Sequence, residues 1–153
     1  MRVWVAGALL LSVLVRATDE QGQAFLDNNK NQPGVVTLAS GLQYKVLASG
    51  AAGAPKPTTS SRVSVHYAGR LVNGKEFDSS LKRGEPAVFG VAQVISGWTE
   101  ALLLMKKGDK WEVYLPSQLA YGSRGAGGVI PPDAALIFTI ELLDVIGGHK
   151  TEL

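Results

Sequence analysis

The sequence predicts an α+β domain, with an antiparallel sheet of about five to six strands wrapped around one short central α-helix and a short helical extension before it. Several segments alternate apolar and polar residues, as half-buried strands do, and one repeats apolar residues at helical spacing. Hydrophobic residues make up 46% of the 153 residues and charged residues only 18%, which favours a packed core over disorder. No repeat, linker or second domain is visible.

The first elements lie before the main domain. The polar segment 18–32 predicts a short helix that ends before Pro33-Gly34. Leu42–Leu47 alternates apolar and polar residues and predicts a half-buried strand. The segment 49–57, rich in Gly, Ala and Pro, predicts a loop.

A second strand is predicted where apolar residues take every other position, at Val63, Val65 and Tyr67. Asn73-Gly74 predicts a tight turn, because both residues tolerate positive φ, and the next segment begins at Phe77. A further turn is expected at residues 84–86, before Phe89.

The central helix is predicted from apolar residues at i, i+3, i+4 and i+7, namely Trp98, Ala101, Leu102 and Met105. Ser96 is expected as its N-cap, and residues 106–108 are expected to end it. Two strands follow. One alternates at Trp111, Val113 and Leu115, and the other is the long segment Leu136–Val145, with Leu136, Phe138, Ile140 and Leu142 on one face.

Composition excludes several classes of chemistry. The chain has no cysteine, which removes disulfides, zinc thiolates and cysteine nucleophiles. Its net charge is +2 and its basic residues are dispersed, so nucleic acid is not an expected partner. Neither of the two histidines accompanies a serine elbow, and His66 is expected to be solvated or structurally hydrogen-bonded rather than catalytic. No nucleotide-binding glycine loop follows a strand, and no metal or cofactor is expected.

The N-terminus resembles a targeting signal. Arg2 precedes the apolar run Val3–Val15, and cleavage is expected before Thr18, so residues 1–17 are predicted to be a signal peptide. The run of about 13 residues is shorter than the roughly 20 that a membrane anchor needs. A buried N-terminal helix is a weaker alternative because the run is apolar on every side.

The C-terminal residues 148–153 form a tail that ends in Lys150-Thr151-Glu152-Leu153. This ending resembles the Lys-Asp-Glu-Leu retention signal and predicts the endoplasmic reticulum lumen if the source is eukaryotic. A chance polar tail is the alternative. In a bacterium the signal peptide predicts the periplasm or export instead, so a secreted or periplasmic location remains open.

Four motifs occur in order across the chain: Val63–Ser80, Val94–Trp98, Ala120-Tyr121-Gly122 and Ile130-Pro131-Pro132, the last followed by a strand containing Phe138. Together they resemble the FKBP family of peptidyl-prolyl cis-trans isomerases, which also bind tacrolimus and rapamycin. Residues 40–147 would form the isomerase domain. Residues 18–39 and the strand after them are similar to the Mip-like, FklB-like branch, whose long upstream helical region often makes a dimer. This chain has no room for that region, so a monomer is expected.

The resemblance implies an apolar pocket built from Tyr67, Phe77, Val94, Ile95, Trp98, Tyr121 and Phe138. Trp98 would be its floor, Phe77 and Phe138 its walls, and Val129 and Ile130 the apolar edge of its flap. The hydroxyl of Tyr121 and the backbone N–H of Ile95 would donate to a carbonyl. Asp78 would accept a hydrogen bond and interact with the twisting amide, with Arg83 beside it. The implied catalytic residues are Asp78, Tyr121 and Phe77.

Such a pocket suits amide rotation. Resonance opposes rotation of a peptide bond by about 18–20 kcal/mol. Twisting removes the resonance and leaves the carbonyl less dipolar. Transfer into an apolar pocket therefore costs less desolvation free energy for the twisted transition state than for the planar amide. Without the resemblance, Tyr121-Gly122 would be read as an ordinary turn. An ordinary core position would be assigned to the other aromatic residues, Trp98, Phe77, Phe89 and Phe138.

The chain departs from the family pattern at three places. Ala87 replaces a pocket aromatic, which predicts an open wall that admits a bulky residue before proline. Gln93 stands where many members have an acid, and the flap 123–129 is rich in glycine and lacks a common histidine. The glycine-rich flap is expected to affect substrate preference and macrolide affinity more than basic activity.

The resemblance therefore implies a secretory-pathway prolyl isomerase without a membrane span after signal cleavage. Its expected partners are proline-containing peptides, unfolded secretory proteins and the macrolides. Two alternatives remain open. The domain could be a non-catalytic proline-recognition or chaperone module, although Tyr121, Asp78, Phe77 and Trp98 are all present. It could also be a secreted effector, against which the C-terminal tail argues.

Overall fold

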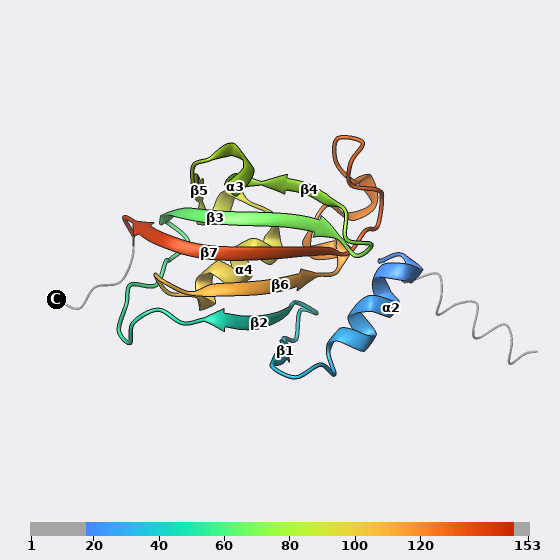
Figure 1. Ribbon diagram of the computed structural model, residues 1–153, viewed down its shortest axis with the longest axis horizontal. Helices are drawn as coiled ribbons and strands as arrows, with labels where there is room; N and C mark the ends of the chain where they lie inside the picture. Colours follow the sequence, from blue (N-terminus) through green and yellow to red (C-terminus); the bar gives the residue numbers. More distant parts are fainter. Residues whose placement is uncertain (1–17, 149–153) are drawn as a thin grey trace, which may run out of the picture.

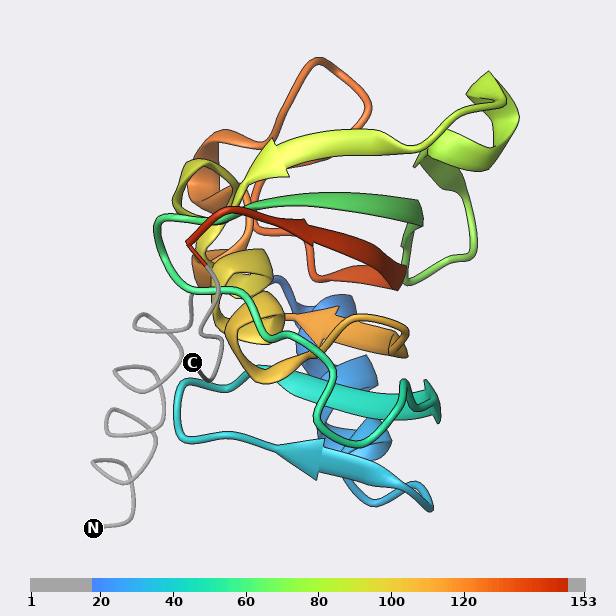
Figure 2. The ribbon, with the colours of Figure 1, turned by 90° about the vertical axis from the view of Figure 1, so that its left-hand side faces the viewer.

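The computed structural model describes residues 18–148, which form one antiparallel sheet with a helix packed across one face (Figure 1). The sheet has seven strands in this described part: β1 (Val35–Thr37), β2 (Gln43–Ala48), β3 (Arg62–Leu71), β4 (Glu76–Ser79), β5 (Ala87–Gly90), β6 (Lys110–Leu115) and β7 (Leu136–Ile146). Helix α4 (Ser96–Leu104) lies on one side of this sheet (Figure 2). The predicted α+β class is confirmed.

The strand order is β1-β2-β6-β7-β3-β4, and β5 also pairs with β3. Strand β4 occupies one end of β3, at Ala68–Arg70, and β5 the other, at Arg62–Val65. The chain between them leaves the sheet and forms the four-residue helix α3 (Ser80–Arg83). Strands β1 and β5 were not predicted as strands, because three or four residues are too few to show an alternating pattern.

The centre of the sheet follows the predicted alternation. Strand β3 pairs with β7 along its whole length, and its residues alternate between buried and half-buried. The buried side faces α4 and contributes the core residues Val63, Val65, Tyr67, Leu136, Phe138, Ile140 and Leu142. Trp111 is also buried and stacks on Tyr44, with 4.1 Å between ring centroids. Core packing thus explains the pattern that identified these strands.

Helix α4 buries Trp98, Ala101 and Leu102 as predicted, and Met105 is buried just beyond its end. The predicted N-cap, Ser96, is wrong. Ile95 is the capping residue, and its carbonyl accepts hydrogen bonds from the backbone N–H groups of Trp98 and Thr99. Ser96 is the first helical residue, and no side chain caps the helix. The helix also ends at Leu104, before the residues expected to end it.

The strand predicted at Leu42–Leu47 is shifted to Gln43–Ala48, and its expected alternation is only partly right. Val46 and Leu47 are exposed, whereas Gln43 is only 4% exposed. The Gln43 side chain accepts a hydrogen bond from Asn29 Nδ2 at 2.8 Å and donates to the Leu26 carbonyl at 3.0 Å. A polar residue is therefore buried here because it binds the N-terminal helix.

That helix is α2 (Glu20–Asn29), which ends at Asn29, before the predicted stop at Pro33. It lies against one end of the sheet (Figure 1). Leu26 packs with Tyr114, Ala135 and Ile137 in a second hydrophobic cluster, separate from the core under α4. The extension thus belongs to the folded domain.

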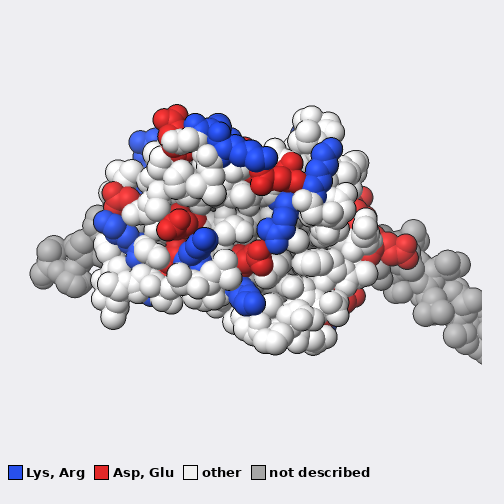
Figure 3. All heavy atoms as spheres, viewed as in Figure 1, with Lys and Arg blue, Asp and Glu red and all other residues white. Residues whose placement is uncertain are grey.

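The outer face of the sheet, opposite α4, carries basic and acidic side chains side by side, and no extended region of one sign appears on it (Figure 3). Arg70 and Glu112 form one such pair, 2.8 Å apart. The predicted signal peptide, residues 1–17, and the tail Lys150–Leu153 lie outside the described residues. Within residues 18–148, no helix is long and apolar enough to cross a membrane.

Candidate active site

A cavity of about 480 Å³ opens where β3, β4, β5, β7 and the start of α4 converge. Its lining is Tyr67, Phe77, Asp78, Phe89, Gln93, Val94, Ile95, Trp98, Tyr121 and Phe138. Most of these side chains are aromatic or aliphatic, and the carboxylate of Asp78 is the charged group among them. The cavity can therefore hold an apolar group close to one anionic hydrogen-bond acceptor.

Trp98 is the centre of the aromatic lining. Its ring makes edge-on contacts with three others, whose centroids lie 5.2 Å away for Tyr67, 5.5 Å for Phe89 and 5.3 Å for Phe138. Phe77 meets Phe138 in the same manner at 5.7 Å. Edge-to-face aromatic pairs of this kind contribute about 0.5–1.5 kcal/mol each beyond their burial. The lining is thus a mutually supported set of rings.

Gly69 on β3 makes room for two of these rings. A Cβ atom at this position would lie 2.6 Å from Phe138 Cε1 and 2.7 Å from Phe77 Cζ. Both distances are far shorter than a normal contact, so any side chain here would push the rings apart. The absence of a side chain at Gly69 therefore determines where this wall of the cavity stands.

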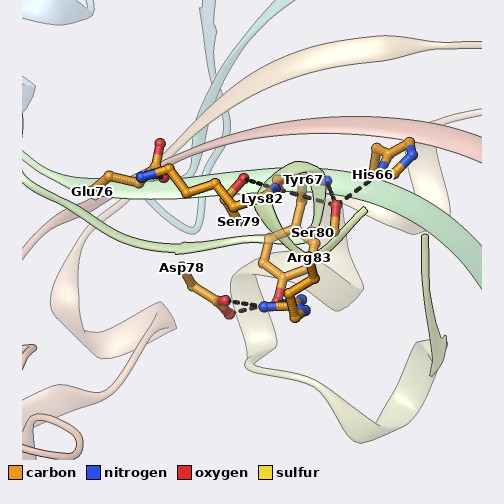
Figure 4. Close-up of polar contacts among 8 residues, drawn as sticks. All are labelled: His66, Tyr67, Glu76, Asp78, Ser79, Ser80, Lys82 and Arg83. Carbon is orange, nitrogen blue, oxygen red and sulfur yellow. Dashed lines mark hydrogen bonds and ion pairs between the residues drawn. The ribbon is translucent and has the colours of Figure 1, made fainter. Parts of the chain in front are cut away.

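A polar network links Tyr67, Asp78 and Arg83 at the cavity (Figure 4). The Tyr67 hydroxyl donates to Asp78 Oδ2 at 2.5 Å, and Arg83 donates to the other carboxylate oxygen at 2.6 Å. Arg83 also donates to the Tyr67 hydroxyl oxygen at 3.0 Å, and its guanidinium lies 5.6 Å from the centroid of the Tyr67 ring. Each member of the network is bonded to the other two.

Helix α3 positions Arg83 for these contacts. Ser79 caps the helix by accepting from Lys82 N–H, and Gly84, with φ of 82°, ends it. The fully buried Ser80 joins α3 to β3: its hydroxyl oxygen accepts from Tyr67 N–H at 2.8 Å and lies 2.9 Å from His66 Nδ1. Of the two alternatives expected for His66, solvated or structurally hydrogen-bonded, the structure shows the hydrogen bond.

The network changes the acidity of its members. Burial raises the pKa of the Tyr67 hydroxyl above its usual value, and the hydrogen bond to Asp78 raises it further. Burial alone would raise the pKa of Asp78 too. The hydrogen bonds from Tyr67 and Arg83 outweigh burial, so the pKa of Asp78 is lower than usual. At neutral pH the site therefore presents a carboxylate and a neutral phenol.

Most residues predicted for the pocket line this cavity: Tyr67, Phe77, Asp78, Val94, Ile95, Trp98, Tyr121 and Phe138. Arg83 lies beside it, bonded to Asp78. The two predicted flap residues do not line it, since Ile130 packs in the core and Val129 is 48% exposed.

Two residues that line the cavity were not among the predicted pocket residues. Phe89 shares the inner face of β5 with Ala87, and this alternation could have identified it. Gln93 was noted only as a departure from the family. Its side chain folds back over Gly90, where a Cβ atom would lie 2.4 Å from Gln93 Oε1. Ala87 itself packs against the core and is not part of the cavity lining.

Within residues 18–148, no three His, Asp or Glu side chains gather closely enough to hold a metal ion. The groups that meet at the cavity are aromatic rings, aliphatic side chains and the polar network. The arrangement can bind an apolar ring and a neighbouring amide through shape and hydrogen bonds.

The fold is thus an antiparallel sheet packed against one helix, with an aromatic cavity where the sheet meets the start of that helix. Residues 53–143 match the family of FKBP-type peptidyl-prolyl cis-trans isomerases, and residues 13–46 match the domain amino terminal to such isomerases. The chain belongs to the FKBP-type peptidyl-prolyl isomerase family.

Individual proteins agree with this assignment. The chain is 57% identical over 126 residues to the peptidyl-prolyl cis-trans isomerase Mip of Coxiella burnetii, covering 82% of this chain and 54% of that protein. It is 53% identical over 125 residues to the outer membrane protein MIP of Legionella longbeachae, covering 82% and 53%. These relatives support the Mip-like branch, although the chain spans only about half of their length.

A solved structure shows the same fold. The peptidyl-prolyl cis-trans isomerase of Pseudomonas syringae pv. tomato superposes with a TM-score of 0.77 at 43% identity, covering 83% of this chain and 92% of that one.

Proposed function

We propose that this chain is a peptidyl-prolyl cis-trans isomerase that rotates Xaa-Pro bonds and assists protein folding. The observation that carries the proposal is the aromatic cavity around Trp98, with the Tyr67–Asp78–Arg83 network beside it. Rotation needs no bond to be made or broken. The site has only to bind the twisted amide better than the planar one, and each 1.36 kcal/mol of that preference is worth about tenfold in rate.

The proposed roles come from the family resemblance, and the cavity lining supports them. The proline ring lies on Trp98, between Phe77 and Phe138. The Tyr121 hydroxyl and the backbone N–H of Ile95 donate to substrate carbonyl groups. Asp78, kept ionised by its partners, interacts with the amide as it twists. Phe77, Asp78 and Tyr121 are thus the proposed catalytic residues, and Val129 and Ile130 would act only through movement of the flap.

The proposed substrates are proline-containing peptides and unfolded exported proteins, and rapamycin and tacrolimus are the proposed inhibitors. The cavity volume of about 480 Å³ is within the range typical of small-molecule sites. We also propose that the chain is a monomer. A preference for a bulky residue such as Leu or Phe before proline was expected from the sequence at Ala87. Because Ala87 does not line the cavity, the cavity gives this preference no support.

The proposed location is secreted or periplasmic. Both relatives named above come from bacteria, which have no endoplasmic reticulum, and one of them is named an outer membrane protein. The comparisons therefore do not support the expected retention in the endoplasmic reticulum lumen.

A peptide isomerase assay on the full chain, with and without rapamycin, tests the proposal. We expect catalysis that rapamycin abolishes, and lower kcat/KM in Tyr121→Phe and Asp78→Ala. Tyr44→Phe and Asp144→Ala are matched controls, because neither residue lines the cavity, and both should retain wild-type activity. A folded chain that binds rapamycin without accelerating isomerisation would instead be a proline-recognition module.

A further inference from the structure

The segment at the start of α2 contacts both ends of the loop that carries Tyr121. This loop, residues 116–135, joins β6 to β7 and is called the Tyr121 loop below. Figure 1 shows the start of α2 next to this orange segment, outside the sheet. The contacting residues are Thr18 and Asp19, which lie about a hundred positions away in the sequence.

Thr18 holds the first end of the loop. Its side chain is 3% exposed, and its hydroxyl oxygen accepts a hydrogen bond from Ser117 N–H at 3.0 Å. The same hydroxyl lies 3.4 Å from Ser117 Oγ and 3.5 Å from Gln118 Oε1. These contacts are made three and four residues before Tyr121, which lines the cavity.

Asp19 holds the second end. Its backbone N–H donates to the Asp133 carbonyl at 2.8 Å, and Asp133 N–H in turn donates to the carbonyl of Gly122 at 2.8 Å. Gly122 directly follows Tyr121. Asp133 has φ of 62°, and among the described residues it is the only one other than glycine with positive φ. Such a conformation persists when its surroundings hold it in place, as Asp19 and Gly122 do here.

The same few residues also determine where α2 begins. The Asp19 side chain caps the helix by accepting from Gly22 N–H at 2.7 Å. A Cβ atom at Gly22 would lie 2.9 Å from Ala135 Cβ and 2.9 Å from Thr18 Cγ2. The backbone at the start of α2 therefore packs against the end of the loop with no room for a side chain at Gly22. The start of α2 and the second end of the Tyr121 loop are therefore packed directly against each other.

The position of Tyr121 needs such support. Its side chain is 39% exposed, and it lies between the short 3-10 helices Ser117–Leu119 and Gly122–Arg124 rather than in a strand. A hydrogen-bond donor misplaced by about 1 Å can cost up to about a hundredfold in rate. We propose that Thr18 and Asp19 are positioning residues for Tyr121, so that the segment before the isomerase domain determines the geometry of the active site. This proposal rests on the proposed function.

The test is a set of substitutions at Thr18 in the full chain. Thr18→Val keeps the shape and removes the hydroxyl, and we expect it to lower kcat/KM about 3- to 10-fold. Thr18→Ser restores the hydroxyl and is expected to restore activity. Asn29→Ala is the matched control, because it removes a buried hydrogen bond at the other end of α2, 2.8 Å long to Gln43, without touching the loop. Its activity should remain at the wild-type level.

A double-mutant cycle separates positioning from general destabilisation. If Thr18 acts through Tyr121, Thr18→Val should have little further effect in a Tyr121→Phe background. Equal losses in both backgrounds, or an equal loss in Asn29→Ala, would overturn the proposal.

Amide hydrogen exchange tests the positioning role of Thr18 and Asp19 independently of isomerase activity. Thr18→Val should accelerate exchange at Ser117 and Asp133, but not along the β3–β7 pairing. If the wild-type chain has no isomerase activity, this exchange pattern still decides the coupling. Unchanged exchange at Ser117 and Asp133 would refute it.

Discussion

Arg83 and Asp78 form an ion pair of 2.6 Å at the cavity, across the single turn of helix α3. Asp78 lies on β4 and Arg83 is the last residue of α3, so the short helix turns the chain back onto its own strand. Tyr67 bridges the pair from β3. The carboxylate is therefore oriented by two donors from different elements.

We expect Arg83→Gln to lower kcat/KM by about 3- to 10-fold, because Asp78 and Tyr67 each lose a hydrogen bond from a charged donor. Lys82→Gln is the matched control on the same short helix. Lys82 pairs with Glu76 at 2.9 Å and does not contact the carboxylate network (Figure 4). Peptide isomerase kinetics would measure both variants. Equal activity of Arg83→Gln and wild type would show that the ion pair has no part in the reaction.

Stability should fall in acid. Partners in the folded state lower the pKa of Asp78, and likewise that of Glu112, which Arg70 and Tyr114 contact. A carboxylate with a lowered pKa contributes stability that is fully present above its unfolded pKa, about 4, and is lost as pH falls through the lower folded value. Urea unfolding between pH 7 and pH 2 should therefore show a constant free energy above about pH 5 and a decline below about pH 4.

Asp78→Asn and Glu112→Gln should each flatten part of this decline. Asp144→Asn is the control, because its pair with Lys107 is exposed and 3.4 Å long, and it should leave the profile unchanged. A wild-type profile that stays flat down to pH 2 would contradict the assignment.

Gly69→Ala is expected to destabilise the protein by about 1–3 kcal/mol and to reduce activity, because the new Cβ overlaps the Phe77 and Phe138 rings. Ser64→Ala lies on the same strand, on the half-buried outer side, and should be nearly neutral. Denaturant unfolding measures the first effect and peptide isomerase kinetics the second. Wild-type kinetics in a destabilised Gly69→Ala would show that the wall formed by these rings does not contact the substrate.

Leu26→Ala should lower the free energy of unfolding by about 2–5 kcal/mol, since it leaves a cavity among Tyr114, Ala135 and Ile137. Asp27→Ala, on the exposed side of the same helix, should change it by less than about 0.5 kcal/mol. Chemical denaturation would compare the two. A Leu26→Ala protein as stable as wild type would mean that α2 adds nothing to the fold.

Much of the secondary structure could be predicted from local periodicity. The alternation at Val63, Val65 and Tyr67 and the helical spacing around Trp98 identified β3 and α4, because each pattern records which side of an element is apolar. The FKBP motifs identified most residues that line the cavity. Phe89 was not among the predicted pocket residues, although its alternation with Ala87 on β5 could have identified it.

The sequence by itself thus determined the fold class, the central elements and the family, because each depends on residues near one another in the chain or on an ordered set of motifs. Only the tertiary structure decided which residues meet across the fold. Gln43 is buried because α2 covers it, and Thr18 contacts the Tyr121 loop. Gly69 is required because the Phe77 and Phe138 rings pack against its backbone. These contacts join residues that are distant in sequence, and no local pattern records what lies opposite a given side chain.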